Sequence, residues 1–174
     1  MGDVSVTKPE QQGASLPEWA EHTQLLHVYL DGLQYEHGAA LVPEGRSGLL
    51  SIRLHSSDET TKQLTGPDSK SMPRIHVQLD LNLTGLHPDA QSEEVVDITD
   101  DLTVFRAQLT FCAAYEIVEQ SALPPEEERQ IFIQKAAVPQ LWLQMRQMVD
   151  VITSQSKTGR VILPASPTGI QQPE

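Results

Sequence analysis

Cysteine, basic side chains and long apolar runs are all scarce in this chain. Its single cysteine, Cys112, cannot form a disulfide within the chain, and such cysteine usage is typical of a reducing compartment such as the cytoplasm. Twelve lysines and arginines stand against 24 aspartates and glutamates, so the net charge of −12 disfavours nucleic acid and acidic membrane surfaces as partners. No apolar run approaches the roughly 18 residues that cross a bilayer. These absences predict a cytoplasmic protein without membrane insertion.

Sequence motifs for catalysis and cofactor binding are also missing. The chain has no phosphate-binding glycine loop, no nucleophile elbow and no dinucleotide fingerprint. Its six histidines are scattered, and no pair has the i, i+4 spacing of a helical zinc site. Because no basic partner or helix N-terminus can be assigned to it, Cys112 is interpreted as a packed structural thiol. We therefore expect no catalytic residue, no metal site and no cofactor.

Four segments show the alternation of apolar and polar residues that is typical of half-buried strands. They are Leu26–Tyr35, Leu50–Leu54, Arg74–Leu83 and Thr103–Val118. In the first segment the apolar parity changes at Asp31-Gly32, which predicts a β-bulge. The links between consecutive segments are polar and contain glycine or proline, so the strands are expected to pair antiparallel.

Beyond the fourth strand the period becomes helical. Pro124-Pro125 followed by three glutamates predicts a helix start, and Pro139 predicts a restart or kink. The fold class is therefore α+β: a four-stranded antiparallel sheet followed by a crossover and a long broken helix. Residues 1–20 are expected to form a flexible arm, 21–163 the domain and 164–174 a disordered tail.

The apolar positions on four strands outnumber those that one helix of about 17 residues can cover. The surplus predicts either self-association or an apolar groove for a ligand. An apolar row at helical spacing is expected to form the interface helix of an oligomer. Its members are Leu141, Met145, Val149 and Ile152.

The order of the elements, together with several short stretches, resembles the SecB protein-export chaperones. The stretches are His27-Val28-Tyr29, Leu33-Gln34-Tyr35-Glu36, Ala113-Ala114-Tyr115-Glu116-Ile117, Pro139 with Leu141-Trp142 and Arg146, and Gly159 with Leu163-Pro164. The resemblance runs from Leu25 to Pro164 and implies an acidic tetramer that binds unfolded polypeptide in apolar grooves between sheet and crossover. The groove residues it implies are Tyr29, Tyr35, Phe111, Ala113, Tyr115, Ile117 and Trp142.

The resemblance further implies docking on the translocase motor SecA through acids on the outer sheet face. Glu36 matches one such acid, but Gly32 stands where a second is expected. Arg106 and Gln108 replace the family's Leu and Glu on the fourth strand, and these departures argue against SecA as a partner.

The expected function is a SecB-like chaperone that binds unfolded or precursor polypeptides and keeps them soluble and competent for export or folding. One alternative is a SecB-like chaperone dedicated to a toxin–antitoxin module. Another is a structural or assembly protein whose surplus apolar surface is only an interface between subunits. An enzyme ranks third among the function classes, because the residue pattern suggests neither a metal nor a substrate.

Overall fold

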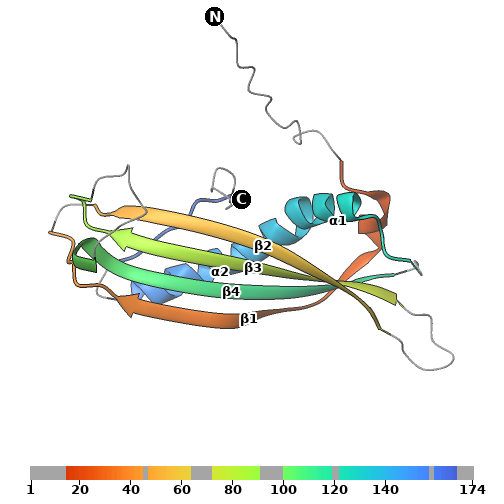
Figure 1. Cartoon of the computed structure of the whole chain (residues 1–174), viewed down its shortest axis with the longest axis horizontal. Coiled ribbons are helices and arrows are strands. Elements are labelled where there is room, and N and C mark those ends of the chain that lie inside the picture. Colours follow the sequence, from red (N-terminus) through yellow and green to blue (C-terminus); the bar gives the residue numbers. More distant parts are fainter. Residues whose placement is uncertain are drawn as a thin grey trace, which may run out of the picture.

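The computed structural model describes residues 15–44, 47–63, 72–90, 100–118, 122–156 and 159–167. Within them a four-stranded antiparallel sheet is followed by one long helix, which confirms the predicted α+β fold class. Figure 1 shows the strands as one curved layer in the order β1-β4-β3-β2. The strands are β1 (Thr23–His37), β2 (Leu49–Gln63), β3 (Met72–Leu86) and β4 (Thr103–Ile117). Short 3-10 turns precede β1 and β4, namely η1 (Glu18–His22) and η2 (Asp100–Leu102).

The two central strands carry the core of the molecule. Alternate side chains of β3 and β4 point to one face, where the long helix covers them. On β3 these side chains are at most 1% exposed, and they are Ile75, Val77, Leu79, Leu81 and Leu83. The strict alternation predicted for this strand is therefore confirmed as burial of one face.

β2 is much longer than the sequence predicted. The predicted strand ended at Leu54, whereas the observed strand continues to Gln63, which lies opposite Met72 of β3. The added residues are almost all polar, so their alternation gives no signal of a buried face. β2 is an edge strand, and beyond Leu54 its backbone ladder with β3 continues without apolar side chains.

β1, the other edge strand, pairs irregularly with β4. The register shifts between Leu30 and Gly32, which confirms the bulge predicted at Asp31-Gly32. A second shift lies between Leu25 and His27. Each extra residue returns the apolar side chains that follow it to the helix-covered face of the sheet.

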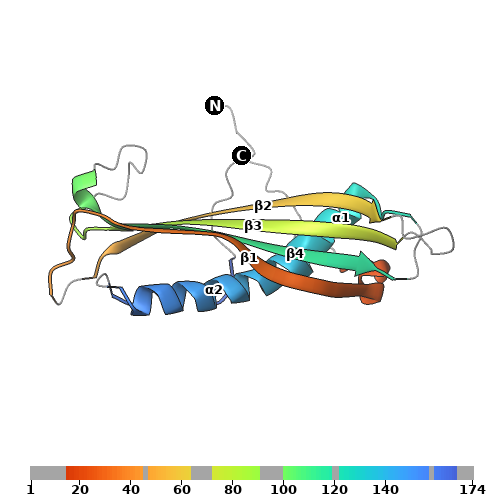
Figure 2. The same cartoon turned by 90° about the horizontal axis from the view of Figure 1, so that it is seen from below.

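The helix is continuous but changes its spacing once. It consists of α1 (Glu126–Phe132), a π-helical turn η3 (Ile133–Ala137) and α2 (Val138–Ser154). Pro139 explains the turn, because proline lacks an N–H and its ring clashes with the carbonyl four residues earlier in α-helical geometry. In the wider turn the N–H of Val138 reaches the carbonyl of Ile133. Figure 2 shows the resulting helix along one side of the sheet, where α2 packs on β3 and β4.

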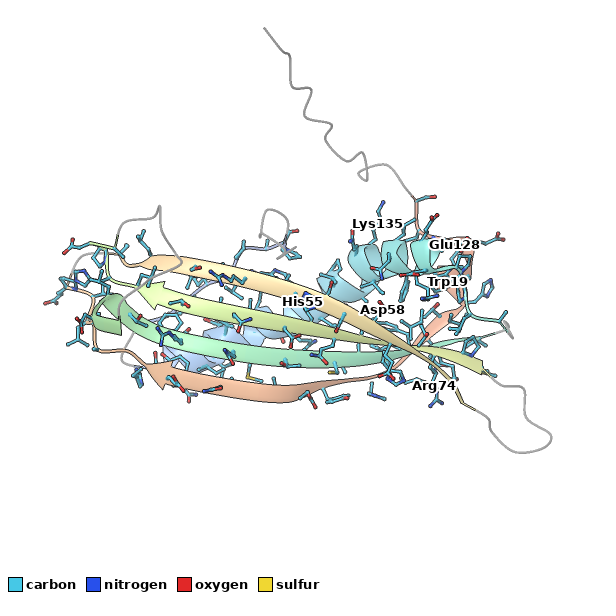
Figure 3. All side chains as sticks on the ribbon, in the orientation of Figure 1. Trp19, His55, Asp58, Arg74, Glu128 and Lys135 are labelled. Carbon is cyan, nitrogen blue, oxygen red and sulfur yellow. The ribbon has the colours of Figure 1, made fainter. Side chains whose placement is uncertain are left out.

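The N-terminal turn η1 anchors α1. Trp19 is only 5% exposed, and its indole Nε1 donates to Glu128 Oε2 at 2.8 Å. Figure 3 shows these two side chains together at the start of α1. The Trp19 and Phe132 rings are also in contact, with centroids 5.1 Å apart. The predicted end of the flexible arm at residue 20 therefore lies inside a packed element, while residues 1–14 and 168–174 lie outside the described residues.

The opposite flank of α1 is held by β2. Gln130 Nε2 donates to Asp58 Oδ1 at 3.0 Å, and Arg129 Nε lies 3.8 Å from Asp58 Oδ2. Figure 3 shows Asp58 on the strand beneath α1. The turn η1 and the strand β2 thus fix the position of the crossover helix over the sheet.

Candidate functional site

The two faces of the sheet differ in chemistry. One face, here called the helix face, carries α1 and α2; the other, here called the open face, is not covered by any helix of the described residues. The open face is mainly polar, and its central side chains bind one another across strands. Thr110 Oγ1 donates to Asp80 at 2.7 Å, and Arg74 forms an ion pair with Glu116 at 2.8 Å. Apolar contact with a ligand is therefore concentrated on the helix face.

Five of the predicted groove residues lie together on the helix face, but they are covered. Tyr115 is 4% exposed, and its ring meets Phe132 of α1 edge-on at 5.2 Å. Its hydroxyl donates to Gln140 Oε1 at 2.9 Å, and burial raises its pKa to about 12. The other covered residues are Phe111, Ala113, Ile117 and Trp142, each at most 5% exposed. In this conformation a ligand reaches them only after the helix or its neighbours move.

The two predicted tyrosines of β1 are separated. Tyr35 lies on the helix face, half-buried, with its ring stacked on Phe105 at 5.8 Å. Tyr29 lies on the open face, because it pairs with Cys112, whose side chain has the outward parity of β4. The nearby Cys112 sulfur raises the pKa of the Tyr29 hydroxyl through its charge and a hydrogen bond, and burial raises the pKa of Cys112. Tyr29 therefore does not share a surface with the other predicted groove residues.

The helix row predicted as an interface faces the chain's own sheet. Leu141 and Met145 are 0% exposed and Val149 is 1% exposed, while Ile152 is half-buried. The helix has an apolar row on its opposite side as well, and Leu143 and Val151 there are 49% and 52% exposed. A second chain meeting α2 in this conformation contacts that outer row. The single helix explains this placement, because its most apolar stripe closes the chain's own core.

Glu36, the predicted docking acid, is exposed on the open face of β1. It accepts a hydrogen bond of 2.6 Å from Gln34 Nε2. The residue opposite Glu36 on β4 is Arg106, a cation at the position where the resemblance implies leucine. A basic partner approaching Glu36 therefore meets a positive charge beside it.

Exposed apolar side chains on the helix face surround two open hollows that sequence reasoning missed. The larger, about 340 Å³, lies between the start of β2 and the C-terminal segment, and Leu50, Phe105 and Ile162 line it. The smaller, about 220 Å³, lies between α2 and the same segment, and Leu143 and Ile162 line it. Ile162 is 70% exposed and belongs to both hollows. No apolar periodicity marks this segment, because residues 159–167 form no helix or strand.

The described part of the chain contains neither a membrane-spanning helix nor a metal-binding cluster. None of its helices combines the length and apolar character of a membrane span. Its histidine, cysteine, aspartate and glutamate side chains form no group of three or more that could hold a metal ion.

The fold is shared with a solved structure. The chain is similar to the SecB-like chaperone Rv1957 of Mycobacterium tuberculosis, solved in complex with a ChAD peptide from the Rv1956 HigA1 antitoxin, with a TM-score of 0.53 and 17% sequence identity. The similarity covers 83% of this chain and 91% of that chain. No protein-family model matches the chain, and no match was found among curated proteins. The likeness establishes a SecB-like fold.

Proposed function

We propose that this protein is a SecB-like chaperone that binds unfolded or precursor polypeptides and keeps them soluble and competent for export or folding. One observation carries the proposal: exposed apolar side chains gather around two adjoining hollows on the helix face, while the open face is polar. The SecB-like fold supports it, since the structural neighbour with this fold was solved with a bound peptide.

The chemistry of the hollows suits clients of varied sequence. The larger hollow is lined mainly by apolar side chains, and Leu50 and Ile162 present theirs to solvent, whereas the smaller one also carries the ion pair of Asp150 and Arg160. Apolar contact is non-directional, so it does not require a particular client sequence. The net charge of −12 keeps such a surface soluble and favours basic clients.

The working form we propose is a homotetramer. The outer row of α2, with Leu143 and Val151 half-exposed, offers apolar surface for contact between chains. The covered residues Tyr115 and Trp142 remain predicted groove residues, and they become available when the crossover helix lifts from the sheet.

Light scattering of the purified protein, with and without an excess of an unfolded, aggregation-prone polypeptide, tests the proposal. We expect a four-chain particle that gains mass with the polypeptide. Leu50→Glu, which places a charge in the larger hollow, should weaken client binding at least about tenfold, because a charge in an apolar contact must be desolvated. The matched control is Gln108→Glu, which adds the same charge on the exposed, open side of β4 and should leave binding unchanged. A closed oligomer indifferent to the polypeptide would instead favour the structural alternative.

A second candidate is a chaperone dedicated to one antitoxin. The structural neighbour is bound to a peptide from an antitoxin, and Arg106 opposite Glu36 disfavours docking of SecA. Affinity purification from the source cells distinguishes the two candidates. Recovery of one dominant small client supports the dedicated chaperone, whereas SecA together with diverse precursors supports the general one.

A further inference from the structure

An extended C-terminal strap, residues 159–164, lies along α2. Its inward side chain, Leu163, is only 2% exposed and belongs to the core, whereas the neighbouring Ile162 points to solvent. Val161 is half-buried against the same core. The alternation of inward and outward side chains is that of an extended peptide seated on an apolar surface.

Four side chains of α2 hold the strap. Trp142 Nε1 donates to the carbonyl of Pro164 at 3.0 Å, and Arg146 Nε donates to the carbonyl of Leu163 at 3.2 Å. The Thr153 hydroxyl accepts the N–H of Val161 at 2.9 Å. The fourth side chain, Asp150, accepts hydrogen bonds from two guanidinium nitrogens of Arg160, from Nε and, at 2.8 Å, from Nη2.

These four side chains form one stripe. They stand at residues 142, 146, 150 and 153, which is the spacing of a single face of an α-helix. The strap runs antiparallel to them, since its later residues meet the earlier residues of α2. Three of the four contacts go to main-chain atoms of the strap, which every polypeptide possesses. The stripe therefore recognises an extended backbone, and side-chain selectivity rests on the buried leucine and on the arginine beside Asp150.

We propose that the stripe Trp142, Arg146, Asp150 and Thr153 is a binding site for an extended polypeptide, which the chain's own strap occupies until a client segment displaces it. The preferred segment has a basic residue followed by aliphatic residues at alternate positions, as in Arg160, Val161 and Leu163. This inference rests on the proposed function: it identifies the stripe as a client-binding site and the strap as the segment that competes with the client for it. The two hollows flank the strap and share Arg160 and Ile162, so a displacing segment enters from surface that is already open.

The strap acts as a tethered competitor in this arrangement. A client binds only the fraction of molecules in which the strap has left, so its apparent affinity is reduced by that fraction. Weakening the strap without altering the stripe therefore tightens client binding. If the strap were only a structural segment, weakening it would loosen the fold and would not tighten client binding.

The indole N–H signals of the two tryptophans test displacement directly. In a ¹H–¹⁵N spectrum Trp142 reports the strap contact, while Trp19, bound to Glu128 at the far end of the helix, is the internal control. The probe is a synthetic peptide with the sequence of residues 159–167, and the control peptide has aspartate in place of its leucine. Adding the probe should shift the Trp142 signal and leave that of Trp19 unchanged, and the control peptide should shift neither.

Affinity for the same probe is then compared between variants of the full chain. Leu163→Ala removes the buried anchor of the strap and should tighten binding of the probe at least about tenfold. The matched control is Leu54→Ala, the same substitution at a side chain of similar burial on β2, 3% exposed, which should leave the affinity unchanged. If Leu163→Ala fails to fold, the shift of the Trp142 signal in the unaltered chain tests the proposal by itself.

The outcomes separate this inference from the function it rests on. Binding of an unfolded client with no shift of Trp142, and with equal affinities in the two variants, overturns the strap as competitor but leaves the chaperone. Failure to bind either the probe or an unfolded client overturns both.

Discussion

Different interactions stabilise the two faces of the sheet, although alternate residues of the same strands supply both. On β3 the helix face consists of buried aliphatic side chains, while the open face carries polar side chains paired across strands, as Arg74 is with Glu116. Burial of apolar area stabilises in proportion to its size, whereas exposed polar pairs contribute little. The comparison teaches that the fold depends on one face, and that the other face is free to vary in charge.

Adjacent residues of β3 test this comparison most strongly. Leu81→Ala should lower the free energy of unfolding by about 2–5 kcal/mol, because Leu81 is 1% exposed and its removal leaves a cavity under α2. Its neighbour Asn82 is exposed on the open face, and Asn82→Ala should change that free energy by less than about 0.5 kcal/mol. Denaturant unfolding measures both. Equal losses in the two variants would mean that the open face also supports the fold.

The pH dependence of stability sharpens the same comparison. Burial raises the pKa of Tyr115 to about 12 from 10, so the unfolded chain loses this proton at lower pH than the folded one. The stabilisation is fully present below pH 10 and is lost as the pH rises through 12, by up to about 3 kcal/mol in total. Tyr115→Phe removes this term, so the difference in unfolding free energy between the two proteins should shift in favour of the variant across that interval. A difference independent of pH would contradict burial as the cause.

The smallest effect is expected from the ion pair of the open face. Arg74→Met keeps most of the side-chain length but removes the charge that faces Glu116, and it should cost at most about 1 kcal/mol of unfolding free energy. Because the pair is partly exposed, added salt should reduce the difference between the variant and the unaltered chain. A salt-independent loss of several kcal/mol would show that the open face is a second core.

The sequence predicted those parts of the fold that depend on apolar periodicity. Such a signal is present in β3, β4 and the helix, because each of them buries one face. A change of parity in the same signal marks the bulge at Asp31-Gly32. The second half of β2 carries none, since an edge strand is held by its backbone ladder. The sequence places Trp19 in the arm, because a lone aromatic residue in a polar stretch shows no periodicity.

The candidate site was predicted less well than the fold. Alternation predicts that Phe111 and Tyr115 share the apolar face of their strand, but periodicity cannot show whether a helix covers an apolar side chain or leaves it open. Tyr29 was grouped with them through the family resemblance, although strand alternation places it on the open face. The sequence does not predict the strap, because hydrogen bonds from side chains to main-chain atoms require no particular residue pattern in the strap.

The π turn has a consequence for sequence alignment. In the turn the N–H of Val138 bonds the carbonyl of Ile133, five residues back instead of the four of an α-helix, and buried residues stand on both sides of it, at Phe132 and Leu141. The turn therefore acts as a one-residue insertion that leaves both halves of the helix facing the sheet. An ungapped alignment of this helix with an uninterrupted one can match the buried positions on one side of residues 133–137, but never on both.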